Sequence, residues 1–461
     1  MHEEQPDHPP RADDEALDSA RAGGDAPAGA GVTRRTLLAG AAAAAGGAVL
    51  GTLPLGAAGR QAAPAAPSRA PAASPGGASP PAAVPPDPTK VPGAPTSAAS
   101  PRSPFVSPAR APVGQITGAS FSPIQDFSGT ITPTDLHFER HHGGVAQIDP
   151  ARYKLVVHGL TERALAFTLD DLRAFPPTTR IHFLECSGNG RAGYRGPKPE
   201  LTPQQIDGLV SNAEWTGVRA RLLLREAGAK RDGTWVLAEG GDAALLSRSV
   251  PVEKLLDDAL VVYAQNGEPL RPAAGYPVRL LLPGWEGNMN IKWLRRLEVV
   301  AQPNMSRDET SKYTDPLPND TARQFSFELD VKSIITSPAH PTKLGRTGWV
   351  PVTGLAWTGR GKVARVDVST DGGRSWSAAE LQEPVLTKAA VRFTLPWRWD
   401  GGPAVLMSRA ADETGAVQPT YEEFARVRGA GTDYHYNHIR AWAVRHDGQV
   451  VYDVDGRGGR A

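Results

Sequence analysis

The chain has 461 residues, of which 21% are charged, and its formal net charge is +1. This balance gives no case for nucleic acid as the main partner, because nucleic-acid-binding proteins concentrate basic residues. The single cysteine excludes an intramolecular disulfide, a c-type haem motif and an iron–sulfur cluster held by cysteines alone. The length suffices for two or more domains with hydrophobic cores.

Residues 1–58 predict a disordered N-terminus followed by a twin-arginine export signal. Residues 1–30 are acidic and rich in Gly and Ala, a composition typical of disorder. Arg34 and Arg35 then precede an apolar Ala/Gly/Leu run that ends near Leu55. The run is short and weakly apolar for a membrane span, so the favoured interpretation is export to the periplasm or the outer face of the cytoplasmic membrane.

Residues 59–115 predict a linker, because Pro, Ala and Ser dominate them and cannot bury enough apolar surface to fold. The folded part is expected to begin near residues 116–121. From there to residue 320, short strands and short helices are mixed without a βαβ rhythm, which favours an α+β domain. One such helix should begin after Thr168, with Asp171 three positions later as part of its cap. No phosphate-loop or dinucleotide glycine motif is present.

A cluster of cationic and imidazole side chains occurs early in this domain, at Arg140-His141-His142. Adjacent strand residues face opposite ways, so His141 and His142 would not share a face, whereas Arg140 and His142 would. A zinc site also needs further ligands, and none occurs at suitable spacing. The pattern favours an anion or cofactor pocket, with a solvated polar loop as the alternative.

The segment Ile181–Arg191 carries the only cysteine. A β-type run ends at Glu185, Cys186 follows, and a Ser-Gly-Asn-Gly turn leads to Arg191. Gly and Asn allow a tight turn in which other groups approach the backbone. A cation near a thiol favours the thiolate, the form that attacks electrophiles and ligates metals. A thiol nucleophile, a metal ligand and a small buried hydrophobe all remain open for Cys186 at this point.

Residues 321–440 predict an immunoglobulin-like β-sandwich, because short strands alternate with turns rich in Gly, Pro and Asp. In the run 363–368, Ala364, Val366 and Val368 alternate with Val363, Arg365 and Asp367, as in a half-buried strand. The domain carries no catalytic constellation, so a structural role is expected. Residues 441–461 are assigned to a C-terminal tail, and the aromatic segment 432–438 is expected to fold back on the first domain.

The order of these motifs resembles the sulfite oxidase family of molybdopterin oxidoreductases across about residues 120–440. The Cys186 loop resembles the family's molybdenum-ligand segment, and Arg140-His141-His142 resembles its Arg-x-His segment. Two positions depart from the common pattern, namely Gly190, where many members have arginine, and Ala274, where a histidine is common. The ECSGNGR loop and the Tyr-His-Tyr-Asn segment look closer to the catalytic subunit of bacterial sulfane dehydrogenases. The other matching segments are Asn266-Gly267, Gly275–Arg279, Pro283-Gly284, Lys292–Leu294 and Val368–Trp376.

The resemblance implies a molybdenum ion held by a pterin dithiolene and by the thiolate of Cys186. The implied cofactor-binding residues are Arg140, His142, Cys186, Asp242, Arg279, Asn290 and Lys292. The implied catalytic residues are Cys186, Arg140, Arg191, Tyr313 and Arg428. The arginines would hold an anionic sulfur substrate by charge-assisted hydrogen bonds.

The implied function is an exported enzyme that oxidises sulfite or a carrier-bound sulfane sulfur. Because the chain has no haem motif, a separate c-type cytochrome is expected as electron acceptor. The second domain resembles the family's dimerisation domain, so a homodimer is expected. Two alternatives are a related reductase of S- or N-oxides and a cofactor-free protein that binds anions in a basic pocket.

Overall fold

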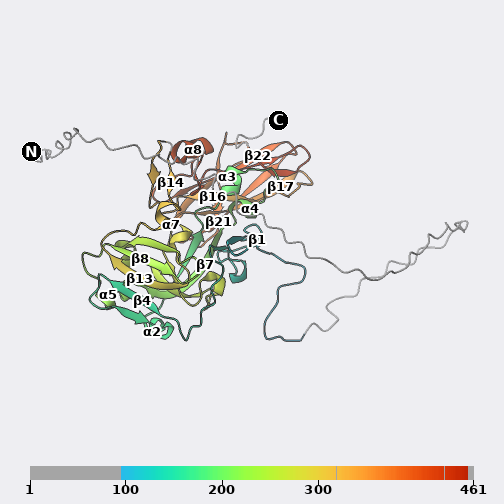
Figure 1. Cartoon of the computed structure of the whole chain (residues 1–461). Helices are drawn as coiled ribbons and strands as arrows, with labels where there is room; N and C mark the ends of the chain where they lie inside the picture. The colour runs from blue at the N-terminus through green and yellow to red at the C-terminus, as the bar shows by residue number, and fades with distance from the viewer. Residues whose placement is uncertain (1–94, 318, 430, 455–461) are drawn as a thin grey trace, which may run out of the picture. The chain divides into compact units, whose positions relative to one another are not determined.

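The computed structural model describes residues 95–317, 319–429 and 431–454 (Figure 1). The expected disordered N-terminus, the twin-arginine signal and most of the expected linker lie outside these residues. No helix in the described part of the chain is long and apolar enough to cross a membrane.

The described chain enters the fold through a small antiparallel sheet that the sequence assigned partly to the linker. Strand β1 (Ala111–Gly114) pairs with β2 (Gly118–Phe121), which pairs with β3 (Glu139–His141). Folded structure therefore begins before residue 116, within the predicted 59–115 linker. The reason is side-chain anchoring as well as pairing, since Arg110 donates a hydrogen bond to the His137 carbonyl at 3.2 Å.

Residues 139–300 form the α+β body that the sequence predicted, built on two sheets. One sheet has the order β11-β10-β7-β6, with β12 also pairing β10, and the other has the order β5-β4-β13-β8-β9. The β13–β4 pair is parallel, whereas the other pairs of these sheets are antiparallel. The strands of the first sheet are β6 (Thr178–Glu185), β7 (Val210–Arg219), β10 (Leu260–Gln265), β11 (Glu268–Pro269) and β12 (Arg279–Leu281). Those of the second are β4 (Leu155–Gly159), β5 (Leu165–Phe167), β8 (Trp235–Gly240), β9 (Ser247–Pro251) and β13 (Leu294–Val300).

Short helices connect these strands, and their ends follow ordinary capping chemistry. Helix α2 (Leu169–Ala174) begins as predicted, because Thr168 and Asp171 form a complete capping box. Helix α5 (Ala220–Ala227) ends at Gly228, whose φ of 66° closes the last turn. The remaining helices of this region are η2 (Thr134–Leu136), α3 (Arg191–Arg195), α4 (Pro203–Asp207), α6 (Val252–Asp257), η3 (Pro272–Ala274), η4 (Gly287–Met289) and α7 (Arg307–Thr310).

The second domain is the predicted β-sandwich, with one sheet of order β16-β17-β21-β20 and another of order β19-β18-β22-β23-β24. The pairing is antiparallel throughout both sheets. The strands of the first sheet are β16 (Lys332–Ser337), β17 (Gly348–Trp357), β20 (Glu380–Leu381) and β21 (Val391–Trp399). Those of the second are β18 (Val363–Ser369), β19 (Ser377–Ala378), β22 (Ala404–Asp412), β23 (Ala441–Val444) and β24 (Val450–Tyr452). A short pair, β14 (Asp315–Pro316) with β15 (Ala322–Arg323), precedes the sandwich, and helix α8 (Tyr421–Arg428) interrupts it.

Two details of the sandwich differ from the sequence analysis. Residues 441–452 are not a tail, because β23 pairs β22 and β24 pairs β23, which adds two strands to the second sheet. In β18, Val363 is buried and Ala364 is exposed, whereas the sequence analysis placed Ala364 on the buried face. The register shifts between Val363 and Arg365, and such a bulge turns the flanking side chains to the other face.

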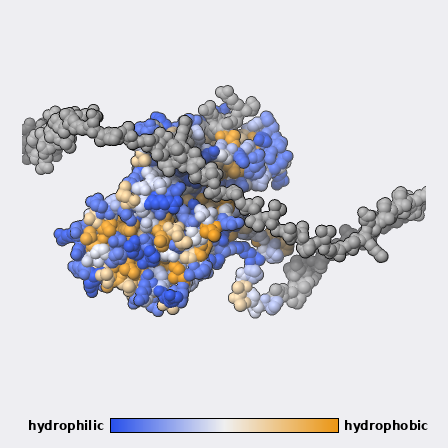
Figure 2. Space-filling view, viewed as in Figure 1, coloured by the Kyte–Doolittle hydropathy of each residue, from blue (hydrophilic) through white to orange (hydrophobic). Residues whose placement is uncertain are grey.

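Figure 2 shows hydrophilic and hydrophobic residues interspersed over the visible face. The hydrophobic core that fills the sandwich continues into the α+β body, because Phe183 of β6 and Val210 of β7 belong to the same buried cluster as Trp357 and Trp442. A second cluster fills the α+β body itself around Leu155, Leu223 and Leu297. The strand that leads to Cys186 thus packs against the sandwich.

Candidate active site

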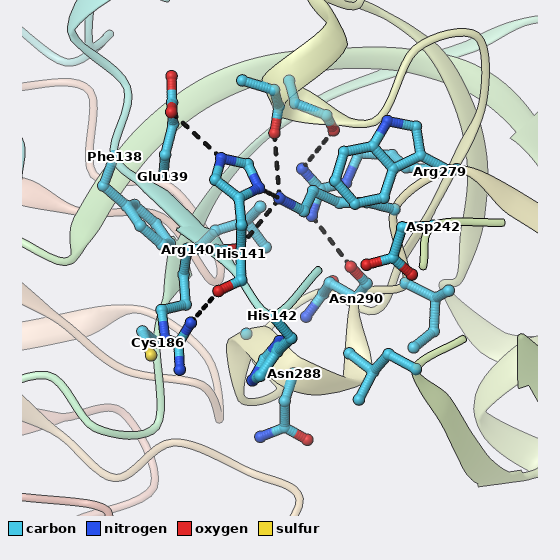
Figure 3. Close-up of a pocket in the computed structure, with 18 of the residues that line it drawn as sticks. Phe138, Glu139, Arg140, His141, His142, Cys186, Asp242, Arg279, Asn288 and Asn290 are labelled. Atoms are coloured by element: carbon cyan, nitrogen blue, oxygen red, sulfur yellow. Dashed lines mark hydrogen bonds and ion pairs between the residues drawn. The ribbon is translucent and has the colours of Figure 1, made fainter. Parts of the chain in front are cut away.

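Two adjoining cavities lie where β3 and β6 end, and we call them the inner and outer cavities. Five residues line both of them, namely Arg140, His142, Cys186, Leu246 and Tyr313. The outer cavity has a volume of about 670 Å³. The side chains that line the inner cavity converge on it from β3, the Cys186 loop, β12 and the segment around η4 (Figure 3). The structure therefore brings together residues separated by more than 170 positions.

The loop that holds Cys186 is fixed by backbone hydrogen bonds. The Cys186 amide donates to the Leu209 carbonyl at 3.0 Å, and the Asn189 amide donates to the Cys186 carbonyl at 2.8 Å. Gly190 has φ of 96°, and a Cβ there would lie 2.5 Å from Nη2 of Arg440. This contact explains why glycine stands at the position where arginine is common, since the Arg440 guanidinium fills that space.

Burial dominates the chemistry of the thiol. It raises the pKa of Cys186, while the Gly188 backbone, Arg140 and Arg191 act in the opposite direction. The predicted effect of neighbouring cations on the pKa is thus present but is outweighed by desolvation. Because a metal cation deprotonates a coordinating thiol, a bound metal would be needed to hold Cys186 as the thiolate.

Two buried cations line the inner cavity. Arg279 donates to the carbonyls of Ala274 at 3.0 Å and Asn290 at 3.1 Å, and burial lowers its pKa to about 9. Its Nε is buried and has no hydrogen-bond partner among the described residues. Lys292 donates to the Arg140 carbonyl at 3.0 Å, and burial followed by the charge of Arg279 lowers its pKa well below the usual value.

The residues that line the inner cavity are suited to bind an anionic cofactor. Buried cations without enough counter-charge are costly, and an anionic group in the inner cavity would offset that cost. The Nε–H of Arg279, which lines this cavity, is a buried donor that has no partner among the described residues. A phosphate-bearing pterin is such an anion, and Cys186 supplies a soft ligand at the edge of the same cavity.

His142 and Tyr313 form a polar pair on the wall shared by both cavities. Nε2 of His142 lies 2.7 Å from the Tyr313 hydroxyl. Burial and the charge of Arg140 lower the pKa of His142 to about 4, whereas burial raises the pKa of Tyr313 above its usual range. At neutral pH the imidazole is therefore uncharged and the phenol keeps its proton. Tyr313 itself has φ of 51°, a strained conformation for a non-glycine residue.

Asp242 and Asn290, also predicted cofactor residues, differ in how they face the cavity. Both line the inner cavity. The Asn290 amide is engaged with the protein, since Oδ1 accepts from the Leu282 amide at 2.6 Å and Nδ2 donates to the Glu286 carbonyl at 3.0 Å. Asn290 thus shapes the loop around η4, while Asp242 presents a buried carboxylate.

The outer cavity contains Arg191, as predicted, and two cations that the sequence analysis missed. Arg191 donates to the Asp433 carbonyl at 2.8 Å, and its side chain is 49% exposed. Arg307 and Lys312 line the same cavity. Their closeness in sequence to Tyr313 was the signal that could have identified them.

Arg428 does not reach the site, contrary to the sequence analysis. Its guanidinium donates to Asp315 Oδ2 at 3.1 Å and to Asp330 Oδ2 at 3.0 Å. It lines neither cavity. The physical reason is that α8 directs it toward two carboxylates of the segment that connects the domains, and these satisfy its charge.

The segment 432–438 does return to the first domain. The Tyr313 amide donates to the hydroxyl of Tyr434 at 3.2 Å. The His435 amide donates to the carbonyl of Ser187, next to Cys186, at 2.8 Å. Tyr434 also lines the outer cavity, so the end of the second domain helps to build the site.

Comparison with known proteins places the chain in a family. An oxidoreductase molybdopterin binding domain matches residues 142–307, and a Mo-co oxidoreductase dimerisation domain matches residues 323–441. Both matches agree with the two domains of the structure. The chain belongs to the sulfite oxidase family of molybdopterin oxidoreductases, as the sequence motifs indicated.

Individual relatives support the same assignment. A solved chain of the sulfane dehydrogenase SoxCD from Paracoccus pantotrophus is 44% identical, with a TM-score of 0.72, and the match covers 75% of this chain and 90% of that one. Mitochondrial sulfite oxidase of Mus musculus is 31% identical over 68% of this chain and 62% of its own length. A nitrate reductase of Solanum lycopersicum is 33% identical over 59% of this chain and 33% of its own length. The chain thus spans less than two thirds of the length of these two curated relatives.

Proposed function

We propose that this protein is a molybdenum-dependent dehydrogenase that oxidises an anionic sulfur compound, either sulfite or a carrier-bound sulfane sulfur. The observation that carries the proposal is the position of Cys186, at the junction of an inner cavity lined by buried cations and a larger outer cavity. The similarity to a sulfane dehydrogenase and a sulfite oxidase supports sulfur as the reacting element.

The cofactor would occupy the inner cavity. Arg279 and Lys292 would bind its anionic groups, and Cys186 would ligate the metal. When bound, such a cofactor supplies two-electron oxygen-atom transfer. Oxidation of sulfite with water as the oxygen source yields sulfate, two protons and two electrons, so the site must bind an anion and release protons.

The residues of the outer cavity would bind the anion. Arg140 and Arg191 would hold the oxygen atoms of the anionic substrate, because a planar guanidinium can donate two parallel hydrogen bonds. The Tyr313 hydroxyl, held by uncharged His142, would donate a hydrogen bond to the substrate and keep its own proton. Burial of His142 and Tyr313 strengthens the contact between them, since little water competes there.

The decisive experiment measures metal content and turnover in the wild type and in Cys186→Ser. We expect about one molybdenum per wild-type chain and sulfite-dependent reduction of an artificial acceptor. Cys186→Ser should fold, because the change is small, but should lose turnover. A fully active Cys186→Ser variant, or wild type purified without molybdenum from a competent host, would overturn the proposal.

The same preparation tests the reductase alternative. The similarity to a nitrate reductase is the observation that favours it. A reductase would oxidise a reduced dye when given nitrate, a sulfoxide or an N-oxide, and would not respond to sulfite. We expect the opposite pattern. A protein with neither activity and no metal would support the anion-binding alternative.

We also propose a separate c-type cytochrome as electron acceptor and a homodimer formed through the second domain. The match to a Mo-co oxidoreductase dimerisation domain supports the homodimer. Sedimentation of the purified protein at micromolar concentration should give the mass of two chains, and a monomer throughout would contradict this. Reduction of added cytochrome c in the presence of sulfite tests the acceptor.

A further inference from the structure

The residue before Cys186 is a buried carboxylate held by three donors. Glu185 is 3% exposed. Its Oε1 accepts from Nδ2 of Asn189 at 2.9 Å and from Nζ of Lys332 at 2.9 Å. Its Oε2 accepts from Nε1 of Trp357 at 2.6 Å. A carboxylate so placed cannot move without leaving donors unpaired in a low-dielectric environment.

Two of those donors come from the sandwich domain. Lys332 begins β16 and Trp357 ends β17, and both are buried, at 2% and 0% exposure. Lys332 also lies 2.5 Å from Asp207 Oδ1, and its ammonium lies 5.4 Å from the centre of the Trp357 ring. The two residues form one contact surface, at which the sandwich meets Glu185 and the end of α4.

The third donor lies within the cysteine loop itself. Asn189 donates to Glu185 through Nδ2, and its Oδ1 accepts from the Leu209 amide at 2.9 Å. The Asn189 carbonyl in turn lies 3.4 Å from Nζ of Lys332. Both ends of the turn that contains Cys186 are therefore attached to the same lysine, one through Glu185 and the other through Asn189.

We infer that Lys332 and Trp357 of the sandwich are positioning residues for the Cys186 loop. They act through Glu185 and Asn189, and they line neither the inner nor the outer cavity. The second domain then has a role besides dimerisation, since it fixes the loop that presents the thiol. This inference rests on the proposed function, because the loop needs to be held in place only if Cys186 is a metal ligand.

Trp357→Phe tests the inference in the full chain, because phenylalanine keeps an aromatic ring and removes the donor to Glu185. Trp442→Phe is the matched control: Trp442 is also fully buried in the sandwich core, but its Nε1 has no hydrogen-bond partner among the described residues. Hydrogen exchange by mass spectrometry, on protein freed of cofactor, measures the order of the loop whether or not the enzyme is active.

We expect the amides of residues 186–190 to exchange about tenfold faster in Trp357→Phe than in the control, because a hydrogen bond to a buried charge is lost. Strands β18 and β22 should exchange equally in both variants. Molybdenum content should fall several-fold in Trp357→Phe alone. Equal loop exchange in both variants, or faster exchange spread evenly over the sandwich, would overturn the inference.

A second variant covers the case in which Trp357→Phe does not accumulate as folded protein. Glu185→Gln keeps the shape of the side chain and removes the charge to which Lys332 and Trp357 donate. The same local increase in exchange is expected, and unchanged loop exchange would overturn the inference. If the wild type holds no molybdenum, the proposed function fails, whereas the exchange comparison still decides this point.

Discussion

The two arginines of α3, one turn apart, have different expected roles: Arg191 contacts the substrate and Arg195 is structural. Arg191 and Arg195 both lie near Asp433, with 3.8 Å and 2.8 Å between guanidinium nitrogen and carboxylate oxygen. Only Arg191 lines the outer cavity. Removing either charge perturbs the same ion-pair cluster, so the pair offers a matched comparison.

We expect Arg191→Gln to raise KM for sulfite about tenfold with a smaller effect on kcat. The reason is the loss of a charge-assisted contact made in both the ground state and the transition state, and partial exposure keeps the effect moderate. Arg195→Gln should leave both constants near wild type. Steady-state kinetics with metal analysis checks this. A loss of molybdenum in Arg191→Gln at unchanged KM would instead assign Arg191 to cofactor binding.

At the scale of elements, the domains meet through two glycines that leave no room for a side chain. Gly284 follows β12 and has φ of 80°, and a Cβ there would lie 2.2 Å from the Gly359 carbonyl oxygen. The Leu329 amide donates to the Gly284 carbonyl at 3.0 Å, and the Gly359 amide donates to the Leu329 carbonyl at 2.9 Å. This close approach connects β12 and β17 by way of the segment between the domains.

Gly284→Ala should therefore lower the free energy of unfolding by roughly 2 kcal/mol or more, from strain at positive φ together with a steric clash against backbone. Gly267→Ala is the control, because Gly267 has φ of 78° but a Cβ there would have no neighbour within 4 Å. The control should show only the strain, about 1 kcal/mol. Urea unfolding of both variants measures the difference, and equal destabilisation would show that the contact between glycines is unimportant.

At the scale of the whole molecule, buried neutral histidines make stability depend on pH. Burial lowers the pKa of His137 to about 3 and that of His182 to about 4. In the unfolded chain both would titrate near 6.5. Between about pH 6.5 and pH 4 the unfolded state binds more protons than the folded state, so stability is fully present above that range and decreases as the pH falls through it.

We expect the free energy of unfolding to fall by about 2 kcal/mol for each of these histidines between pH 7.5 and pH 5. His182→Gln should reduce that dependence, because glutamine does not titrate and can still donate to the Lys388 carbonyl, which lies 3.3 Å from Nδ1 of His182. His446→Gln, at an exposed position, should leave the pH dependence of the free energy of unfolding unchanged. Denaturant unfolding at the two pH values provides the test, and an identical pH dependence in His182→Gln and wild type would refute the assignment.

We also propose that the chain is exported, by a signal that lies outside the described residues. Replacing Arg34 and Arg35 with lysine should leave cofactor-loaded protein in the cytoplasm, since the twin-arginine pair is the recognised feature. Fractionation of cells with a molybdenum assay on each fraction measures this. Normal export of the double variant would point to another route.

The sequence by itself determined the α+β body, the sandwich and the cysteine loop, because these depend on local patterns. It also determined the family, because the order of the motifs along the chain is part of the sequence. Strand periodicity, the Thr168 cap and the glycine-rich turn after Cys186 act over a few residues. The same local reasoning placed Arg140 with His142, since alternate residues of a strand share a face.

Only the tertiary structure decided which distant residues meet. It placed Arg428 beside Asp315 and Asp330 and added Arg307 and Lys312 to the outer cavity. It also showed that residues 441–444 and 450–452 of the predicted tail are strands of the sandwich. It also showed that burial outweighs the cations around the Cys186 thiol. These outcomes depend on desolvation and on tertiary contacts, which sequence spacing does not encode.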